Sequence, residues 1–241
     1  MAVLGDRTHG HSPEEVAARI CAPPGRGVLR DAVYGAIDGS VTTFAIVAGV
    51  AGAGLSPFVI VALGLANVLA DGFSMAAANY TGTRAEQENA SRIREIEEQH
   101  IDNFPEGERL EVKEILRTKG LEGDVLEAAT EAVTADRENW IALMMEGEYG
   151  LGGVDPNPMR AAITTFVAFL AAGVIPLLPF VFGVENAFAL SGFVTLAVFF
   201  AIGALKSRWS LSAWWRSGAE TLLIGGVAAG LAYFVGTLFS A

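Results

Sequence analysis

Five side chains in two long apolar segments have types and a spacing that suit metal coordination. In the segment NVLADGFSM, Asn67, Asp71 and Met75 follow one another at intervals of four residues, so a helix would place them on one face. In the preceding segment YGAIDGSVTTF, Asp38 is followed one helical turn later by Thr42. Carboxylate, amide and hydroxyl oxygens suit hard cations, and a methionine sulfur shifts the preference toward softer ions such as Fe²⁺. The two segments therefore predict a pathway site for a divalent metal.

The two aspartates are unexpected in apolar surroundings. A charged side chain in a membrane span costs roughly 2.5–3.5 kcal/mol on insertion scales, so such residues are functional-site candidates. No basic residue in either segment offers Asp38 a partner. Asp71 could act as a second proton acceptor, or it could pair with a basic residue near the membrane surface.

A second group of candidate ligands lies in a charged stretch further along the chain. Glu108, Glu111 and Glu114 recur every three residues, and like charges at this spacing destabilise a helix slightly unless a cation relieves the repulsion. Each glutamate run alone would also fit a solvated helix face, but the runs together, mixed with histidine and methionine, favour metal binding. The candidates are Glu97, His100, Glu108, Glu111, Glu114, Met144, Met145 and Glu148.

The pair Glu97 and His100 also matches the E-x-x-H motif of di-iron carboxylate bundles. Those sites need two copies of the motif, whereas the other two histidines of this chain, His9 and His11, lie far from the charged stretch. A membrane di-iron oxidase therefore stays the less favoured alternative, and no other enzyme motif is evident. We expect a protein that is not an enzyme.

The charge of the chain is concentrated in one region. Of 27 acidic residues, 19 fall between residues 81 and 160, in a chain of 241 residues that is 52% hydrophobic. This distribution predicts an all-α integral membrane protein with a helical insertion. The formal net charge of −11 favours cations over nucleic acid as partners. We expect a cytosolic N-terminal segment in 1–28, membrane helices in 29–81 and 159–241, and a cytosolic helical metal-binding domain in 82–158.

Five apolar runs are long enough for membrane helices, which need about 20 residues. Lysine and arginine gather in the connections on one side of the five spans, which places the N-terminus and the insertion in the cytoplasm and the C-terminus outside. The single cysteine, Cys21, and the absence of a signal-like start weakly favour a prokaryotic cell membrane. The predicted spans are 32–55, 57–80, 161–182, 187–205 and 217–239.

The insertion is predicted to be helical. Residues 82–103 contain no proline and should continue the second span as one helix, which Pro105 ends. A second helix is expected over 106–119, and one or two more over 124–149. Upstream, HSPEEVAARI should form a short helix capped by Ser12.

With these residues in view, the chain resembles the vacuolar iron transporter family, as a prokaryotic-type member. The resemblance runs from about Leu29 to the C-terminus. It rests on LRDAVYGAIDGSVTTFAIVAGVAGA, ADGFSMAAANY, the glutamate-rich insertion ending in WIALMMEGEYGL, PNPMRAA and VIPLLPF.

The resemblance implies a homodimeric, proton-coupled transporter that moves Fe²⁺, and often Mn²⁺, out of the cytosol. It also implies five membrane helices per subunit, a cytosolic helical metal-binding domain, and the lipid bilayer as environment. By position, Asp38 and Met75 match pathway ligands, and the insertion residues that match metal ligands are Glu97, Glu108, Glu111, Met144, Met145 and Glu148.

Two positions depart from the family pattern. Asn67 stands where a glutamate is common, with Asp71 one turn away as a candidate substitute, and His100 stands where a glutamate ligand is usual. An added imidazole would suit Fe²⁺, Co²⁺ or Zn²⁺. We therefore expect transport of Fe²⁺ or Mn²⁺ coupled to protons; the alternatives are a membrane-anchored metal-binding or sensing protein and the di-iron oxidase.

Overall fold

The computed structural model describes residues 10–20, 27–152 and 157–239, and every regular element in these ranges is a helix. The predicted all-α class is confirmed. The chain forms two compact units, one from residues 27–85 and 157–241 (the membrane unit) and one from 1–26 and 86–156 (the insertion unit). The predictions on Cys21 and His9 lie outside the described residues.

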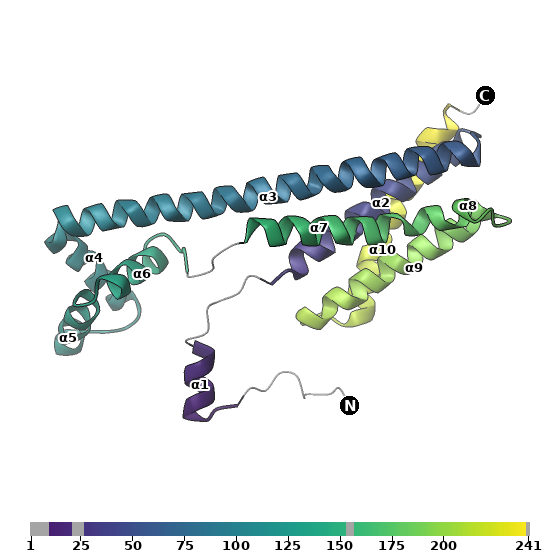
Figure 1. Cartoon of the computed structure of the whole chain (residues 1–241). Coiled ribbons are helices and arrows are strands. Elements are labelled where there is room, and N and C mark those ends of the chain that lie inside the picture. Colours follow the sequence, from purple (N-terminus) through teal and green to yellow (C-terminus); the bar gives the residue numbers. More distant parts are fainter. Residues whose placement is uncertain (1–9, 21–26, 153–156, 240–241) are drawn as a thin grey trace. The chain divides into compact units, whose positions relative to one another are not determined.

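Five helices are long and apolar enough to cross a membrane, as the hydropathy of the chain predicts. They make the protein an integral membrane protein, and Figure 1 shows them as separate coloured ribbons. The spans are α2 (Leu29–Gly52), α3 (Pro57–Asn103), the segment Pro158–Val181, α9 (Ala187–Lys206) and α10 (Trp214–Thr237).

The third span is broken near its end. The sequence predicts a proline kink there, and the structure has α7 (Pro158–Gly173), a 3₁₀ turn η2 (Ile175–Leu177) and a short helix α8 (Leu178–Val181). Pro176 and Pro179 lack the N–H group that an uninterrupted helix would need. The carbonyl oxygen of Pro176 instead accepts a 2.6 Å hydrogen bond from the Ser191 hydroxyl in α9.

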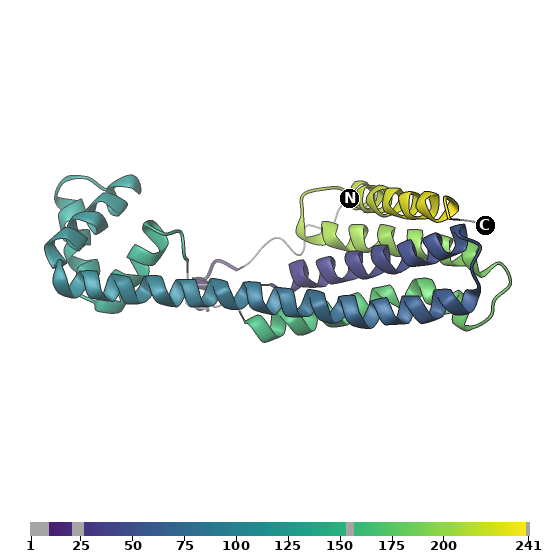
Figure 2. The same ribbon diagram turned by 90° about the horizontal axis from the view of Figure 1, so that it is seen from above.

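Helix α2 is the central helix of the membrane unit and packs against α7, α9 and α10 (Figure 2). Its glycines permit a close approach, because a Cβ atom at Gly35 would lie 2.3 Å from the Thr165 carbonyl oxygen of α7. A Cβ atom at Gly39 would lie 2.4 Å from the Phe169 carbonyl oxygen. The G-x-x-x-G spacing thus serves a contact within this chain, whereas the sequence had also allowed a contact between subunits.

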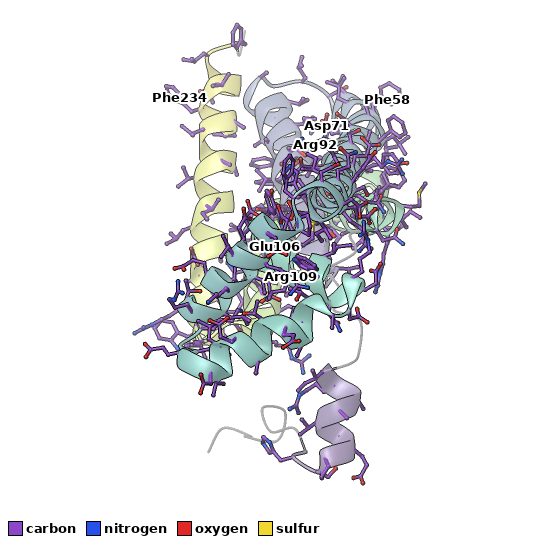
Figure 3. All side chains as sticks on the ribbon, turned by 90° about the vertical axis from the view of Figure 1, so that its left-hand side faces the viewer. Phe58, Asp71, Arg92, Glu106, Arg109 and Phe234 are labelled. Carbon is purple, nitrogen blue, oxygen red and sulfur yellow. The ribbon has the colours of Figure 1, made fainter. Side chains whose placement is uncertain are left out.

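The outer face of the membrane unit carries large apolar side chains. Phe58 is 79% exposed and Phe234 is 61% exposed, and Figure 3 shows both pointing away from their helices. Exposed apolar side chains of this size fit a lipid environment.

In the insertion unit, residues 86–147 form the C-terminal part of α3 and three shorter helices. Helix α3 ends at Asn103, in agreement with the predicted stop before Pro105, and a turn at residues 135–136 splits the last predicted segment in two. Asp136 caps the last helix by accepting a 2.9 Å hydrogen bond from the Asn139 backbone N–H. The helices are α4 (Pro105–Thr118), α5 (Gly123–Thr134) and α6 (Arg137–Gly147).

The insertion unit has its own apolar core. Side chains from α3, α4, α5 and α6 pack together, and two arginine pairs, Arg94 with Glu138 and Arg137 with Asp102, join α6 to α3. The buried core residues are Ile101, Val112, Leu116, Leu126, Trp140, Ile141 and Met144.

Two short helices complete the described chain. Helix α1 (Pro13–Ile20) begins as predicted, since the Ser12 hydroxyl accepts a hydrogen bond from the Glu15 backbone N–H. A 3₁₀ turn, η3 (Ser207–Trp209), follows α9.

Candidate metal centres

Three side chains of the insertion unit converge into a candidate metal site. Glu97 and His100 come from α3, one helical turn apart, and Glu108 comes from the start of α4. One ligand atom from each residue lies within 4.8 Å of the other two. The His100 Nδ1 atom is 3.4 Å from Glu108 Oε1 and 3.8 Å from Glu97 Oε1. We call these three residues the insertion cluster.

The two carboxylates of the cluster are buried with part of their hydrogen-bonding capacity unused. Glu97 is 0% exposed and Glu108 is 5% exposed. Among the described residues, neither Glu97 Oε2 nor Glu108 Oε2 has a hydrogen-bond partner. Burying a charge without compensation is costly, and a cation bound between the carboxylates would supply that compensation. The geometry of the cluster therefore suits a divalent cation.

The electrostatics of the cluster point the same way. Burial, together with the negative charges of Glu111 and Glu97, raises the pKa of Glu108 to about 7. Burial and the charges of Glu148 and Glu97 also raise the pKa of Glu111. A cation would relieve the repulsion among these acids, so metal and protons should compete for the cluster.

The end of α6 brings two further residues to the cluster. The negative charge of Glu148, a predicted ligand, is among the causes that raise the pKa values of Glu111 and Glu108. The Tyr149 hydroxyl donates a 2.9 Å hydrogen bond to Glu97 Oε1. Sequence reasoning missed Tyr149, although its position directly after a candidate ligand was a usable signal.

The other predicted ligands of the insertion lie in different surroundings. Met144 is 0% exposed inside the apolar core, and Met145 packs against that core. Glu114 is exposed and pairs with Arg117. The cluster defined by the geometry therefore does not include these three residues, and their predicted role as ligands remains a prediction.

The predicted pathway residues of the membrane unit lie between α2 and α3. The Asn67 side-chain amide donates a 3.3 Å hydrogen bond to the Thr42 hydroxyl, which in turn donates to the Asp38 carbonyl oxygen at 2.8 Å. Asp38 lies on α2 and Asp71 on α3. All five residues, including Met75, are partly buried. We call Thr42, Asp38, Asn67, Asp71 and Met75 the membrane stripe.

A further polar contact at one end of the stripe was not foreseen. Asp31 of α2 is 5% exposed and accepts a 3.0 Å hydrogen bond from the Asn79 amide of α3. The same amide donates to the Thr165 hydroxyl of α7 at 2.7 Å. Asn79 follows Met75 by four residues, so the spacing of the stripe could have indicated it. The contact joins three spans of the membrane unit.

Comparison with known proteins adds independent information. A model of the VIT family matches residues 29–237. The chain is 32% identical over 209 residues to vacuolar iron transporter 1 of Arabidopsis thaliana, an alignment covering 86% of this chain and 84% of that protein. It is also 32% identical over 222 residues to a vacuolar iron transporter of Toxoplasma gondii, covering 87% of this chain and 74% of that protein.

Proposed function

The chain belongs to the VIT family, and we propose that it is a proton-coupled transporter that moves Fe²⁺ out of the cytosol, with Mn²⁺ as the second candidate cargo. The names of its relatives support iron as the cargo. The observation that carries the proposal is the presence of two carboxylates, Asp38 on α2 and Asp71 on α3, in helices of spanning length. Among the described residues, neither carboxylate has an ion-pair partner.

In the proposed mechanism, the insertion cluster first collects metal from the cytosol. Two carboxylates and one imidazole form a ligand set for Fe²⁺, and would also hold Mn²⁺, Co²⁺ or Zn²⁺. Metal then enters the membrane stripe, where ionised Asp38 coordinates it together with the sulfur of Met75. The amide oxygen of Asn67 and the hydroxyl of Thr42 are further oxygen ligands available nearby.

Release would depend on protons from the opposite side of the membrane. Protonation of Asp38 or Asp71 removes the charge that attracts the cation and so weakens the coordination. Each release would then carry protons inward, which couples metal export to the proton gradient.

We propose that the N-terminus and the insertion face the cytoplasm. Basic residues lie at the helix ends that fall on one side when the five spans alternate in direction: Arg30 in α2, Arg160 in α7, Lys206 in α9 and Arg216 in α10. The C-terminus is then extracytoplasmic. We also keep the proposals of a homodimer and of a prokaryotic cell membrane, which rest on the sequence alone.

A direct test is metal flux into proteoliposomes that contain the purified chain. Fe²⁺, Mn²⁺, Co²⁺ and Zn²⁺ are compared with and without a proton gradient, and internal pH is recorded with a trapped dye. We expect Fe²⁺ uptake that the gradient accelerates and that moves protons in the opposite direction. Binding of metal without any flux would contradict transport and support a membrane-anchored binding or sensing protein. Oxygen-dependent consumption of Fe²⁺ would instead support the di-iron oxidase.

A further inference from the structure

We propose that Tyr149 is a positioning residue of the insertion cluster. Its hydroxyl group donates a hydrogen bond to one carboxylate oxygen of Glu97, and this fixes the orientation of the carboxylate so that the other oxygen can bind the metal. This inference rests on the proposed function, because it assumes that the cluster binds a divalent cation. It assigns a role to a residue that the ligand set itself does not include.

The two oxygens of Glu97 have different environments. Oε1 accepts the 2.9 Å hydrogen bond from the Tyr149 hydroxyl and lies 3.8 Å from His100 Nδ1. Oε2 is buried and has no hydrogen-bond partner among the described residues. A carboxylate fixed through one oxygen presents the other in a defined direction, as outer hydrogen bonds do for metal ligands in general.

Tyr149 is able to act as a donor. The Tyr149 hydroxyl has one proton to donate, and it gives that hydrogen bond to the Glu97 carboxylate at 2.9 Å.

The backbone at the end of α6 fixes the position of this tyrosine. Gly150 has φ = +67°, its N–H donates to the Glu146 carbonyl oxygen at 3.1 Å, and the Leu151 N–H donates to the Met145 carbonyl oxygen at 2.8 Å. The bond from Gly150 to Glu146 is the one that defines the αL motif, in which a helix ends at a residue with positive φ. The same helix end lies close to α4, because a Cβ atom at Gly147 would lie 2.6 Å from the Ile115 side chain.

The backbone at the helix end therefore positions the tyrosine, and its hydroxyl contacts the cluster through Glu97 Oε1. Its side chain is also 36% exposed, so removal of the hydroxyl should leave the apolar core intact. These features separate a positioning role from a purely structural one and make Tyr149→Phe an informative change.

The experiment titrates Co²⁺ into the full chain in detergent micelles and records both the Kd and the visible absorption of the bound ion, which reports the number and geometry of its ligands. The variants are Tyr149→Phe, Gly150→Val and the control Tyr80→Phe. Tyr80 has similar exposure, 37%, and lies on α3 in the membrane unit. Glu97→Gln reports whether the cluster binds the ion at all.

We expect Tyr149→Phe to raise the Kd for Co²⁺ by about tenfold, the lower end of the range for outer-shell partners. The absorption of the bound ion should change as well, because Glu97 becomes free to bind through both oxygens. Gly150→Val, which strains the positive φ without removing the hydroxyl, should change affinity in the same direction. Tyr80→Phe should match the wild type, and the far-ultraviolet circular dichroism of all variants should be unchanged.

The outcomes separate this inference from the proposed function. If the wild type binds Co²⁺ and Tyr149→Phe binds it with the same affinity and absorption, the positioning role is wrong and the metal site stands. If Glu97→Gln binds Co²⁺ as tightly as the wild type, the metal site itself is wrong. A weaker Kd in Tyr149→Phe that comes with loss of helix signal would show a structural role and would also overturn the inference.

Discussion

The insertion cluster and the membrane stripe use similar ligand types in different arrangements. In the cluster, ligand atoms of Glu97, His100 and Glu108 lie within 4.8 Å of one another, and both carboxylates are almost fully buried. In the stripe, Asn67, Asp71 and Met75 follow one another along α3 at intervals of four, and every side chain is partly buried. The hydrogen bond from Asn67 to Thr42 is one of those that link α3 to α2. The first arrangement concentrates negative charge at one point, and the second distributes it along a helix pair.

This difference fits two stages of transport. A site with two unsatisfied carboxylate oxygens should hold a cation firmly, because the ion relieves both burial and repulsion. A pathway needs ligands that attract the ion enough to admit it and weakly enough to release it. We therefore expect changes in the stripe to reduce flux with little effect on binding, and changes in the cluster to do the reverse.

The largest expected effect is on flux, from Asp38→Asn. The change removes the charge of the central proposed ligand while keeping its size, and removal of a ligand should exceed the 10- to 100-fold typical of outer-shell partners. We expect at least about a 100-fold loss of Fe²⁺ flux in proteoliposomes, with Co²⁺ affinity at the insertion cluster unchanged. Glu185→Gln, an exposed acid of the same unit, is the control and should transport normally. Full gradient-driven transport by Asp38→Asn would contradict the mechanism.

Glu108→Gln should weaken metal binding and stabilise the metal-free insertion unit. The Kd for Co²⁺ should rise by about 100-fold, because a charged ligand is lost and this costs more than the loss of a typical outer-shell partner. Without metal, the insertion unit should become more stable at neutral pH, because a buried carboxylate is replaced by a neutral group. Isothermal titration and hydrogen exchange of the α4 amides measure the two effects.

The control for this change is Glu106→Gln, an exposed glutamate on the same helix that is labelled in Figure 3. It should alter neither the affinity nor the exchange. Equal effects of the two variants would mean that general charge, and not the cluster geometry, attracts the metal.

Acidification should affect the cluster through Glu108. Its pKa is raised from 4.5 to about 7, so protons compete with the metal below neutral pH. The Kd for Mn²⁺ should rise by up to about tenfold per pH unit below pH 7. Acidification should stabilise the metal-free insertion unit, although it weakens metal binding. The folded state holds the Glu108 proton more tightly than the unfolded state does, so the stability of the unit should fall as pH rises from about 4.5 to about 7. An affinity that does not change between mildly acidic and mildly alkaline pH would contradict this prediction.

The smallest expected effect is on selectivity in the stripe. Met75→Leu keeps the volume and removes the sulfur, so the preference for Fe²⁺ over the harder Mn²⁺ should fall by about threefold in flux competition assays. Met159→Leu changes an exposed methionine of α7 and serves as the control. An unchanged ratio in Met75→Leu would exclude the sulfur as a ligand.

The fold was largely predictable, because its signals are local. Long apolar runs indicated the five spans, and the absence of proline between residues 82 and 103 indicated that α3 continues to Asn103. The break of the third span was only partly foreseen: the sequence indicated a kink at Pro176, and the structure ends α7 at Gly173 and adds a 3₁₀ turn. How a proline is accommodated depends on neighbours such as Ser191, which a single segment does not reveal.

The candidate site was less predictable, because its contacts join distant parts of the chain. Helical spacing placed Glu97 beside His100, but the hydrogen bond from Tyr149 spans 52 residues. The bond from Asn79 to Thr165 spans 86 residues and depends on how α3 and α7 are rotated. The exposure of each glutamate was equally hard to predict from the sequence, since Glu108 is buried and Glu114, on the same helix, is exposed.

The glycine contact between α2 and α7 has a consequence for how such a protein can evolve. At Gly35 and Gly39 the backbones of the two helices meet directly, so the contact leaves no room for a side chain at either position. Asp38 and Thr42 follow these glycines by three residues and lie on the same face of α2, so the residues proposed to set the chemistry are next to those that set the packing. A mutation at either glycine should therefore displace the neighbouring ligands as well, which makes the two kinds of position evolve together.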